Sequence, residues 1–158
     1  MSDKINPFEK KKKGVFFFKS SNPYEFYDLL NGKNMDDKQD VWGTLIFPEN
    51  AKKPCPLIIP IHGSAGLREG HHTHMVNLLD AGFAIFRIHH FESRGVISIV
   101  ENQTEVTLAS MITDAFRALT LVSKHPDVDS DKIGIMGWSL GGSCLLYTSD
   151  AADDRMRG

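Results

Sequence analysis

A serine between two glycines, in the run G-W-S-L-G at residues 137–141, has the spacing of a catalytic nucleophile. The run directly follows an apolar stretch, residues 133–136, which predicts a strand that turns sharply into a helix. Such a turn lifts the hydroxyl clear of the backbone, where a base can remove its proton. Glycines are needed because side chains would collide across the turn. The pattern favours a nucleophilic Ser139 over the alternative, a glycine-rich turn with an incidental serine.

A second stretch of the same kind is the apolar run 58–61 followed by H-G-S-A-G at residues 62–66. A loop of small residues after a strand can present backbone N–H groups to a developing oxyanion. We expect one donor from Ser64 or Ala65 and the other from Leu140, the residue after the serine. The alternatives are a plain turn or a phosphate loop, but the glycine patterns typical of phosphate loops are absent from the sequence.

Alternating strands and helices must position these two loops. Five stretches rich in β-branched and aromatic residues predict strands, namely 15–19, 41–47, 57–61, 83–88 and 133–136. Helices are expected at 24–31, with Asn22 as N-cap, Pro23 at its start and Gly32 as C-cap, and at 69–81 and 104–124. Several strands are continuously apolar, which is typical of a sheet covered on both faces. We therefore predict an α/β fold with a doubly wound, mostly parallel sheet.

The helix expected at 104–124 has apolar residues at three- and four-residue spacing. This spacing predicts one apolar stripe that packs on the sheet, formed by Val106, Ala109, Ile112, Ala115, Phe116, Leu119 and Val122. Before the first strand, the lysines 10–13 are expected to lie in a solvated, frayed terminus.

The composition is that of an ordinary soluble domain, with 158 residues, 41% hydrophobic and 24% charged. A formal net charge of −2 gives no reason to expect a nucleic acid or a membrane as partner. Cys55 and Cys144 are too few for a disulfide framework and have no metal-ligand spacing. No stretch has the length of a signal-peptide core or a membrane span. We expect a cytoplasmic protein, and the oligomeric state stays open.

Histidines in two places invite a functional interpretation. His71, His72 and His74 cluster near the start of a helix, but no carboxylate or cysteine has the spacing of a metal site, so we expect solvent-facing residues and no metal. His89 and His90 follow a strand at the sheet edge where active-site residues collect. One of them lines the pocket, or both pack at the end of the strand.

Four motifs in order resemble the dienelactone-hydrolase family: HGSAG at 62–66, FESRGV at 91–96, VENQ at 100–103 and VDSDKIGIMGWSLGG at 128–142. The resemblance covers residues 41–143. It implies an α/β-hydrolase fold that hydrolyses a small-molecule ester or lactone through an acyl-enzyme, without a cofactor. Dienelactone hydrolase itself has cysteine as nucleophile, so Ser139 makes the chain more similar to the general esterases of the family.

The resemblance also implies roles for individual residues. Ser139 would be the nucleophile, with oxyanion amides from Leu140 and from Ser64 or Ala65, and with substrate contacts from Arg94, His62 and Trp138. For Arg94, two interpretations are weighed evenly: a bidentate contact to a substrate carboxylate, or a salt bridge within the protein.

The sequence after Ser139 lacks the rest of a catalytic triad. In this fold the chain order is serine, acid, histidine, but residues 140–158 contain no histidine. The segment from Cys144 is similar to a translated sequencing-library adapter, a native variant tail being the alternative. We expect an N-terminal extension over 1–40, part of a hydrolase domain over 41–143 and an artefactual tail over 144–158, in an inactive, poorly soluble fragment.

Two other functions stay open at the level of the sequence. One is a peptidase of the same fold, which would use the same serine on a different carbonyl group. The other is a non-enzymatic α/β binding module that keeps the serine turn as a structural feature.

Overall fold

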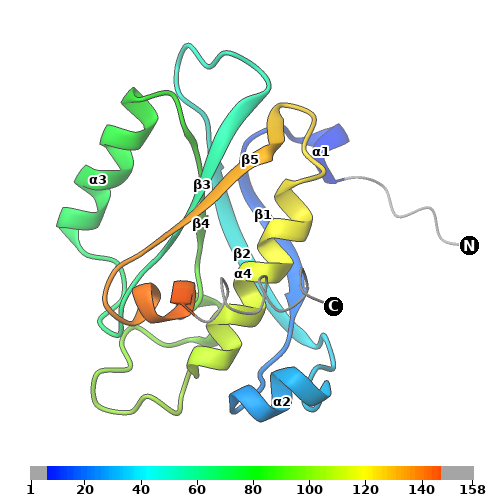
Figure 1. Cartoon of the computed structure of the whole chain (residues 1–158), viewed down its shortest axis with the longest axis vertical. Coiled ribbons are helices and arrows are strands. Elements are labelled where there is room, and N and C mark those ends of the chain that lie inside the picture. Colours follow the sequence, from blue (N-terminus) through cyan, green and yellow to red (C-terminus); the bar gives the residue numbers. More distant parts are fainter. Residues whose placement is uncertain (1–6, 147–158) are drawn as a thin grey trace, which may run out of the picture.

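The computed structural model describes residues 7–146, and they form a sheet with helices packed on it (Figure 1). The strands are β1 (Gly14–Ser20), β2 (Gln39–Ile46), β3 (Cys55–Ile61), β4 (Ala84–Ile88) and β5 (Val128–Gly137). The helices are α1 (Pro7–Lys10), α2 (Phe26–Asn31), α3 (Glu69–Asp80) and α4 (Leu108–Val122), with a single 3-10 turn at Glu92–Arg94. All five expected strands and all three expected helices are confirmed, with shifted ends.

The sheet has the order β1-β2-β4-β3-β5. β3 lies parallel to both of its neighbours, β4 and β5, whereas β2 lies antiparallel to β1 and β4. Four of the five described strands therefore run in the same direction, and the predicted mostly parallel sheet is confirmed. Central β3 is buried along most of its length, as its apolar sequence requires.

The connections reverse direction at β4. From β3 the chain passes through α3 to the adjacent β4, and from β4 it returns through α4, past β3, to β5. Since such crossovers are right-handed, the two helices cover opposite faces of the sheet, which makes it doubly wound. The winding thus changes direction between β3 and β5, and the carboxyl ends of the strands at such a point are the usual place for a ligand in these sheets.

Two N-terminal features differ from the expectation. The predicted frayed terminus contains α1, whose Phe8 is buried, with its ring centroid 4.8 Å from that of Phe16. Asn22 does not cap α2, which begins later, because its side chain is bonded to Gln39 and Arg94 instead. Gly32 does end α2 in a left-handed conformation, as predicted.

The buried face of α4 is rotated from the predicted stripe. Phe116 and Leu119 are 44% and 37% exposed, whereas Met111, Asp114 and Ala118 are completely buried. The apolar pattern included two outward-facing residues and missed a buried carboxylate, because periodicity ranks residues only by hydrophobicity. Thr107 caps the helix with its hydroxyl, accepting from the Ser110 N–H, so α4 starts later than residue 104.

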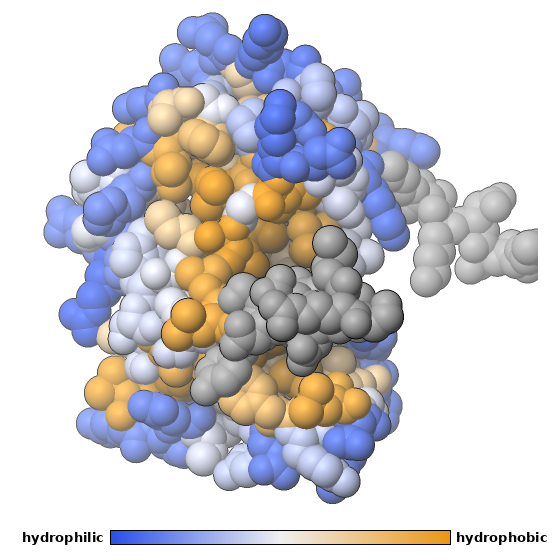
Figure 2. Space-filling view, in the orientation of Figure 1, coloured by the Kyte–Doolittle hydropathy of each residue, from blue (hydrophilic) through white to orange (hydrophobic). Residues whose placement is uncertain are grey.

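Strand β5 forms one edge of the sheet, and its residues from Ile133 to Gly137 are only partly buried. Figure 2 shows an area of hydrophobic residues near the centre of this view, surrounded by hydrophilic ones. An unpaired edge beside apolar surface favours self-association. In the described part of the chain, no helix is both long and apolar enough to span a bilayer.

Leu57 provides a test of the core, since its side chain is completely buried in the central strand. Replacing it with alanine removes buried methyl groups and leaves a cavity, so we expect Leu57→Ala to lower the free energy of unfolding by about 2–5 kcal/mol in urea denaturation. Ile97→Ala is the control, because Ile97 is 88% exposed and its truncation should change stability by less than about 0.5 kcal/mol. Equal losses in the two variants would contradict this core.

Candidate active site

Ser139 occupies a sharp turn between a strand and a helix. β5 ends at Gly137, residues 140–146 are helical, and Ser139 lies between them with φ of +54°. A non-glycine residue in this left-handed region is strained, and such strain collects at functional sites. The Ser139 side chain is exposed, although the helix after it is anchored in the core by buried Cys144. The turn therefore presents a hydroxyl to solvent from a rigid base.

Three glycines allow the loops after β3 and β5 to touch. A Cβ on Gly137 would overlap the carbonyl of Gly141, and a Cβ on Gly141 would overlap the carbonyl of Ile61. A Cβ on Gly63 would lie 3.1 Å from the Ser139 Cβ. The backbone of the loop at 62–66 thus passes directly beside the serine because both loops lack side chains at the contact.

Hydrogen bonds to two of its carbonyl oxygens hold the loop at 62–66 in place. The Gly63 carbonyl accepts from the Gly66 N–H at 3.0 Å, and the Ser64 carbonyl accepts from the Ile99 N–H at 2.8 Å. Within residues 7–146, the N–H groups of Ser64, Ala65 and Leu140 donate to no backbone or side-chain acceptor. The three amides that the sequence singled out therefore have uncommitted N–H groups, and they lie on the two loops that meet where Gly63 touches Ser139.

His62 is buried, only 2% exposed, beneath this loop. Its ring packs edge-on against Phe91 at 4.4 Å and faces the ring of His90 at 5.4 Å, both between centroids. Burial, together with the neighbouring His90, lowers the pKa of His62 to about 4. The sequence-based assignment of His62 as a substrate contact is therefore corrected, since the neutral ring lies inside the protein.

A buried polar network lies next to His62. Asp114 of α4, completely buried, accepts from His90 Nδ1 at 2.8 Å, from Ser20 Oγ at 2.5 Å and from Arg94. Burial alone would raise the pKa of Asp114, but the hydrogen bonds from His90 and Arg94 keep that pKa below its ordinary value. Sequence reasoning missed this carboxylate, and the one available signal was an aspartate within an apolar helix face.

Arg94 belongs to this network and has no free donor. Arg94 Nη1 and Nη2 donate to the two carboxylate oxygens of Asp114 at 2.8 and 3.0 Å, in bidentate geometry. The remaining N–H groups donate to Asn22 Oδ1, His90 O and Ser21 O. Of the two interpretations of Arg94, the structure has the internal salt bridge; the assignment as a donor to substrate is corrected, because all five donors are engaged.

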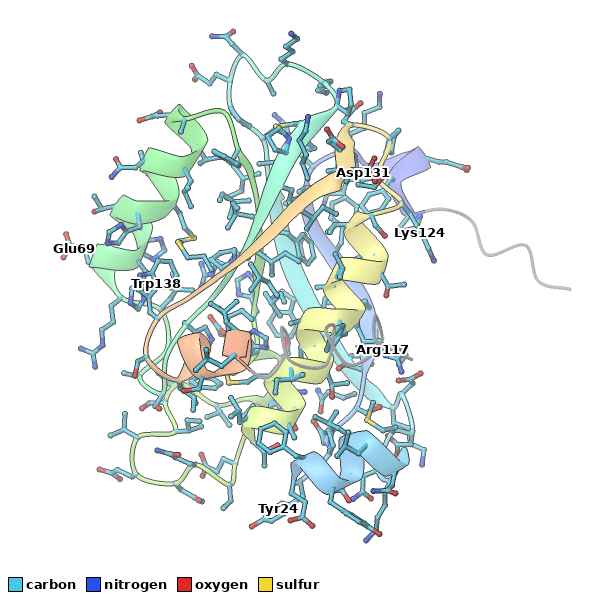
Figure 3. All side chains as sticks on the ribbon, viewed as in Figure 1. Tyr24, Glu69, Arg117, Lys124, Asp131 and Trp138 are labelled. Carbon is cyan, nitrogen blue, oxygen red and sulfur yellow. The ribbon has the colours of Figure 1, made fainter. Side chains whose placement is uncertain are left out.

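Trp138 lies against the first turn of α3, the helix that begins at Glu69 (Figure 3). Its ring stacks on that of His71 at 4.3 Å between centroids, with His74 further away at 6.0 Å. His71 is thus half-buried against an aromatic ring, whereas His72 and His74 are exposed, as expected. No three potential ligands within residues 7–146 are grouped to hold a metal ion. His89 packs on Trp42 and hydrogen-bonds to Thr44, so of the two interpretations given for it, it packs at the end of the strand.

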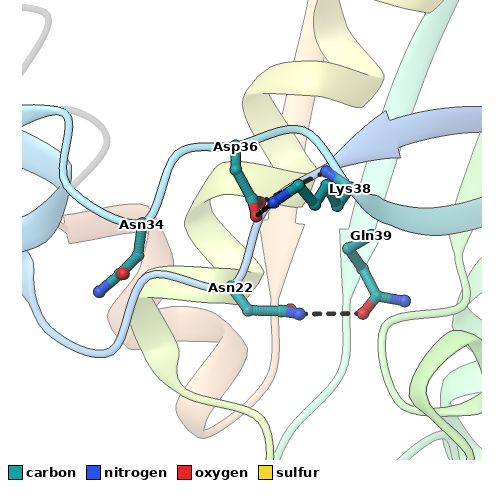
Figure 4. Close-up of a pocket in the computed structure, with 5 residues that line it drawn as sticks. All are labelled: Asn22, Asn34, Asp36, Lys38 and Gln39. Atoms are coloured by element: carbon teal, nitrogen blue, oxygen red, sulfur yellow. Dashed lines mark hydrogen bonds and ion pairs between the residues drawn. The ribbon is translucent and has the colours of Figure 1, made fainter.

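A polar pocket lies elsewhere, near the end of β1 and the start of β2, and contains none of the predicted site residues (Figure 4). It is lined by Asn22, Asn34, Asp36, Lys38 and Gln39. Its side chains satisfy one another: Asn22 donates to Gln39 at 3.0 Å, and Lys38 pairs with Asp36 at 3.2 Å. We therefore place the candidate active site at Ser139 and not in this pocket.

The contact between the two loops can be tested at Gly141. We expect Gly141→Ala to lower the free energy of unfolding by about 1–3 kcal/mol or more, because the added methyl group meets backbone that cannot move aside. Gly142→Ala is the matched control: there the nearest atom, the Gly137 carbonyl oxygen, is 3.6 Å away, and alanine favours the helix by about 1 kcal/mol. Thermal melts would contradict this packing if Gly141→Ala were as stable as Gly142→Ala.

The role of Arg94 can be tested by its effect on stability. Arg94→Leu leaves a buried carboxylate without its main counter-ion, and we expect a loss of about 3–5 kcal/mol in chemical denaturation. Arg117→Leu removes an exposed ion pair with Asp37 and should cost less than about 1 kcal/mol. If Arg94→Leu were as stable as the wild type, the prediction that the Arg94–Asp114 salt bridge stabilises the fold would be wrong.

Known proteins resemble this chain over most of its length. "Putative hydrolase YtaP" of Bacillus subtilis (strain 168) is 24% identical over 131 residues, which are 70% of this chain and 44% of that protein. Est1E from Butyrivibrio proteoclasticus, solved with ferulic acid bound, is 26% identical with a TM-score of 0.58, covering 73% of this chain and 45% of Est1E. P91, a dienelactone hydrolase-like promiscuous phosphotriesterase from metagenomic libraries, is 18% identical with a TM-score of 0.50, covering 84% and 53%.

The structural matches place the fold and a family model places the family. The matches agree with the α/β-hydrolase fold, and the chain spans about half the length of each of the three proteins above. The BD-FAE family model matches residues 44–153, which include both loops of the candidate site. The chain therefore belongs to the BD-FAE family of hydrolases.

Proposed function

We propose that this chain is part of a serine hydrolase that cleaves carboxylic esters or lactones through an acyl-enzyme, as dienelactone-hydrolase-like esterases do. The observation that supports it best is the pairing of a strained, exposed Ser139 with uncommitted backbone N–H groups on the adjoining loop. Nucleophile and oxyanion donors within one small volume are what acyl transfer requires.

The proposed reaction follows from the positions of these groups. Ser139 Oγ attacks the ester carbonyl as a base takes its proton, and the carbonyl oxygen becomes an oxyanion held by the N–H of Leu140 and that of Ser64 or Ala65. Collapse of the intermediate breaks the bond to the alcohol, which leaves with the proton that the base took, and an acyl-Ser139 remains. Water, deprotonated by the same base, then attacks this ester and releases the acid and the free serine. Of the three side chains expected to contact the substrate, Arg94 and His62 are bonded within the protein, so Trp138, next to the serine in the chain, is the one we propose as a substrate contact.

The general base is not one of the two buried histidines near the site. His62 and His90 are both buried, and the Nδ1 atom of each is bonded within the protein. We propose that a longer protein supplies an acid and a histidine after Ser139, in the chain order of this fold. The 158-residue chain alone would then hydrolyse esters only at the residual rate that oxyanion stabilisation provides.

The names of the relatives support the substrate class. Est1E was solved with ferulic acid, a carboxylic acid that an esterase releases from its ester, and another structural match is a glucuronoyl esterase from Solibacter usitatus, with a TM-score of 0.51. One name describes a bound carboxylic acid and the other an esterase, and neither mentions a peptide. We therefore propose that aryl or alkyl carboxyl esters, not peptide bonds, are the substrates.

Covalent labelling tests this proposal. We expect a fluorophosphonate to label the full-length protein, read from the source gene, and Ser139→Ala to abolish labelling because the attacking oxygen is lost. Ser143→Ala, one helical turn later on the same helix, is the control that should still be labelled. Labelling that survives Ser139→Ala, or none in the wild type, would overturn the proposal. Faster turnover of a peptide anilide than of an aryl ester would favour a peptidase.

A further inference from the structure

His62 makes an unusual hydrogen bond for a buried histidine. Its Nδ1 lies 2.9 Å from the carbonyl oxygen of Gly63, the next residue in the chain. A carbonyl oxygen can only accept, so Nδ1 must carry the proton in this bond. The same carbonyl also accepts from the Gly66 N–H at 3.0 Å. Two donors from different directions thus fix the orientation of one carbonyl group.

That carbonyl belongs to the peptide group between Gly63 and Ser64. The group is planar and trans, so its C=O and the Ser64 N–H point in opposite directions. Holding the Gly63 oxygen toward His62 therefore turns the Ser64 N–H away from His62. The residue before Ser64 is in contact with the serine, since a Cβ on Gly63 would lie 3.1 Å from the Ser139 Cβ. The orientation of this candidate oxyanion donor depends on the side chain beneath it.

The other ring nitrogen of His62 supports a role beyond packing. His62 Nε2 is buried, and within residues 7–146 it has no hydrogen-bond partner. A buried polar atom without a partner lowers stability, so an apolar residue of the same size would suit the core better. The position thus retains an imidazole at a cost in stability, and the Nδ1–H bond to Gly63 is what the imidazole provides.

The surroundings of His62 keep it neutral with this proton arrangement. His90 faces its ring, and Asp114 and Arg94 hold His90 in place from below. Burial is the largest cause that lowers the pKa of His62 to about 4; His90 and Arg87 also lower that pKa, whereas the hydrogen bond to the Gly63 carbonyl and the carboxylate of Glu92 raise it. Near neutral pH the ring therefore has one proton, which the Gly63 carbonyl keeps on Nδ1.

We infer that His62 is a positioning residue: through the Gly63 carbonyl it aims the backbone N–H of Ser64 at the oxyanion formed on attack by Ser139. The inference rests on the proposed hydrolase function and assigns Ser64, rather than Ala65, as the second oxyanion donor. Arg94, Asp114 and His90 support His62 in turn. A buried charge network therefore reaches the reacting atoms without touching the substrate.

Two isosteric substitutions test this inference in the full-length protein. The amide nitrogen of asparagine takes nearly the place of Nδ1, whereas leucine has the same shape without a donor. We expect His62→Leu to lower kcat and kcat/KM together by roughly 10- to 100-fold, somewhat less than loss of a whole oxyanion donor, with KM nearly unchanged. His62→Asn should restore kcat to within about threefold of the wild type, as expected when one hydrogen bond carries the effect.

The thermal stability of the same variants separates positioning from a structural role. We expect the Tm of His62→Leu to equal or exceed that of the wild type, because leucine removes the unpartnered Nε2. A parallel fall in Tm and kcat, or equal kcat for the leucine and asparagine variants, would overturn the inference.

Long-range proton–nitrogen NMR provides a readout independent of activity. At pH 7 the His62 ring should have its proton on Nδ1 and should begin to titrate only near pH 4. A proton on Nε2 would refute the inference even in an active enzyme. If instead the wild type fails to react with fluorophosphonate while His62 shows the Nδ1–H tautomer, the proposed function fails and the loop geometry stands.

Discussion

The close approach of two backbone segments, at the carboxyl ends of β3 and β5, is the constraint on which the candidate site depends. The Trp138 N–H donates to the Ile61 carbonyl at 3.1 Å, and Gly141 lies directly against that same carbonyl. No side chain fits between them, so the glycines of both loops are fixed by sterics. The sheet order makes these two strands neighbours, because the winding reverses between them. Ser139 and its flanking amides therefore meet as a consequence of topology.

A second layer holds this arrangement from inside. Asp114 joins α4 to β1 through Ser20 and to the segment after β4 through His90 and Arg94. Three segments that are distant in sequence thus share one buried carboxylate, and loss of any partner would leave a charge without compensation. This layer ends at His62, directly beneath the loop beside the serine. The polar interior and the candidate site are therefore one continuous structure.

Within the described residues, β5 is an edge strand with no neighbour on its outer side, and no acid and histidine of a triad lie beside Ser139. β5 is paired on one side only and is partly buried, and the chain spans about half the length of its relatives. A hydrolase of this fold needs its acid and histidine beside the serine, but the Nδ1 atoms of the buried His62 and His90 are bonded within the protein. The candidate nucleophile and the candidate oxyanion donors are thus local to two loops, whereas the proposed acid and histidine would come from other segments.

The sequence by itself determined the features that depend on residues close together in the chain, namely the strands and the two glycine-containing loops. Continuous apolar runs specified the strands, and glycine spacing specified the turn at Ser139 and the loop at 62–66, because strand burial and turn sterics are local properties. Only the tertiary structure decided the roles of Arg94, Asp114 and His62. Their partners lie at distances along the chain that no local pattern encodes; Ser20 and Asp114 are separated by 94 positions. Burial and charge pairing depend on which segments meet, and folding alone decides that.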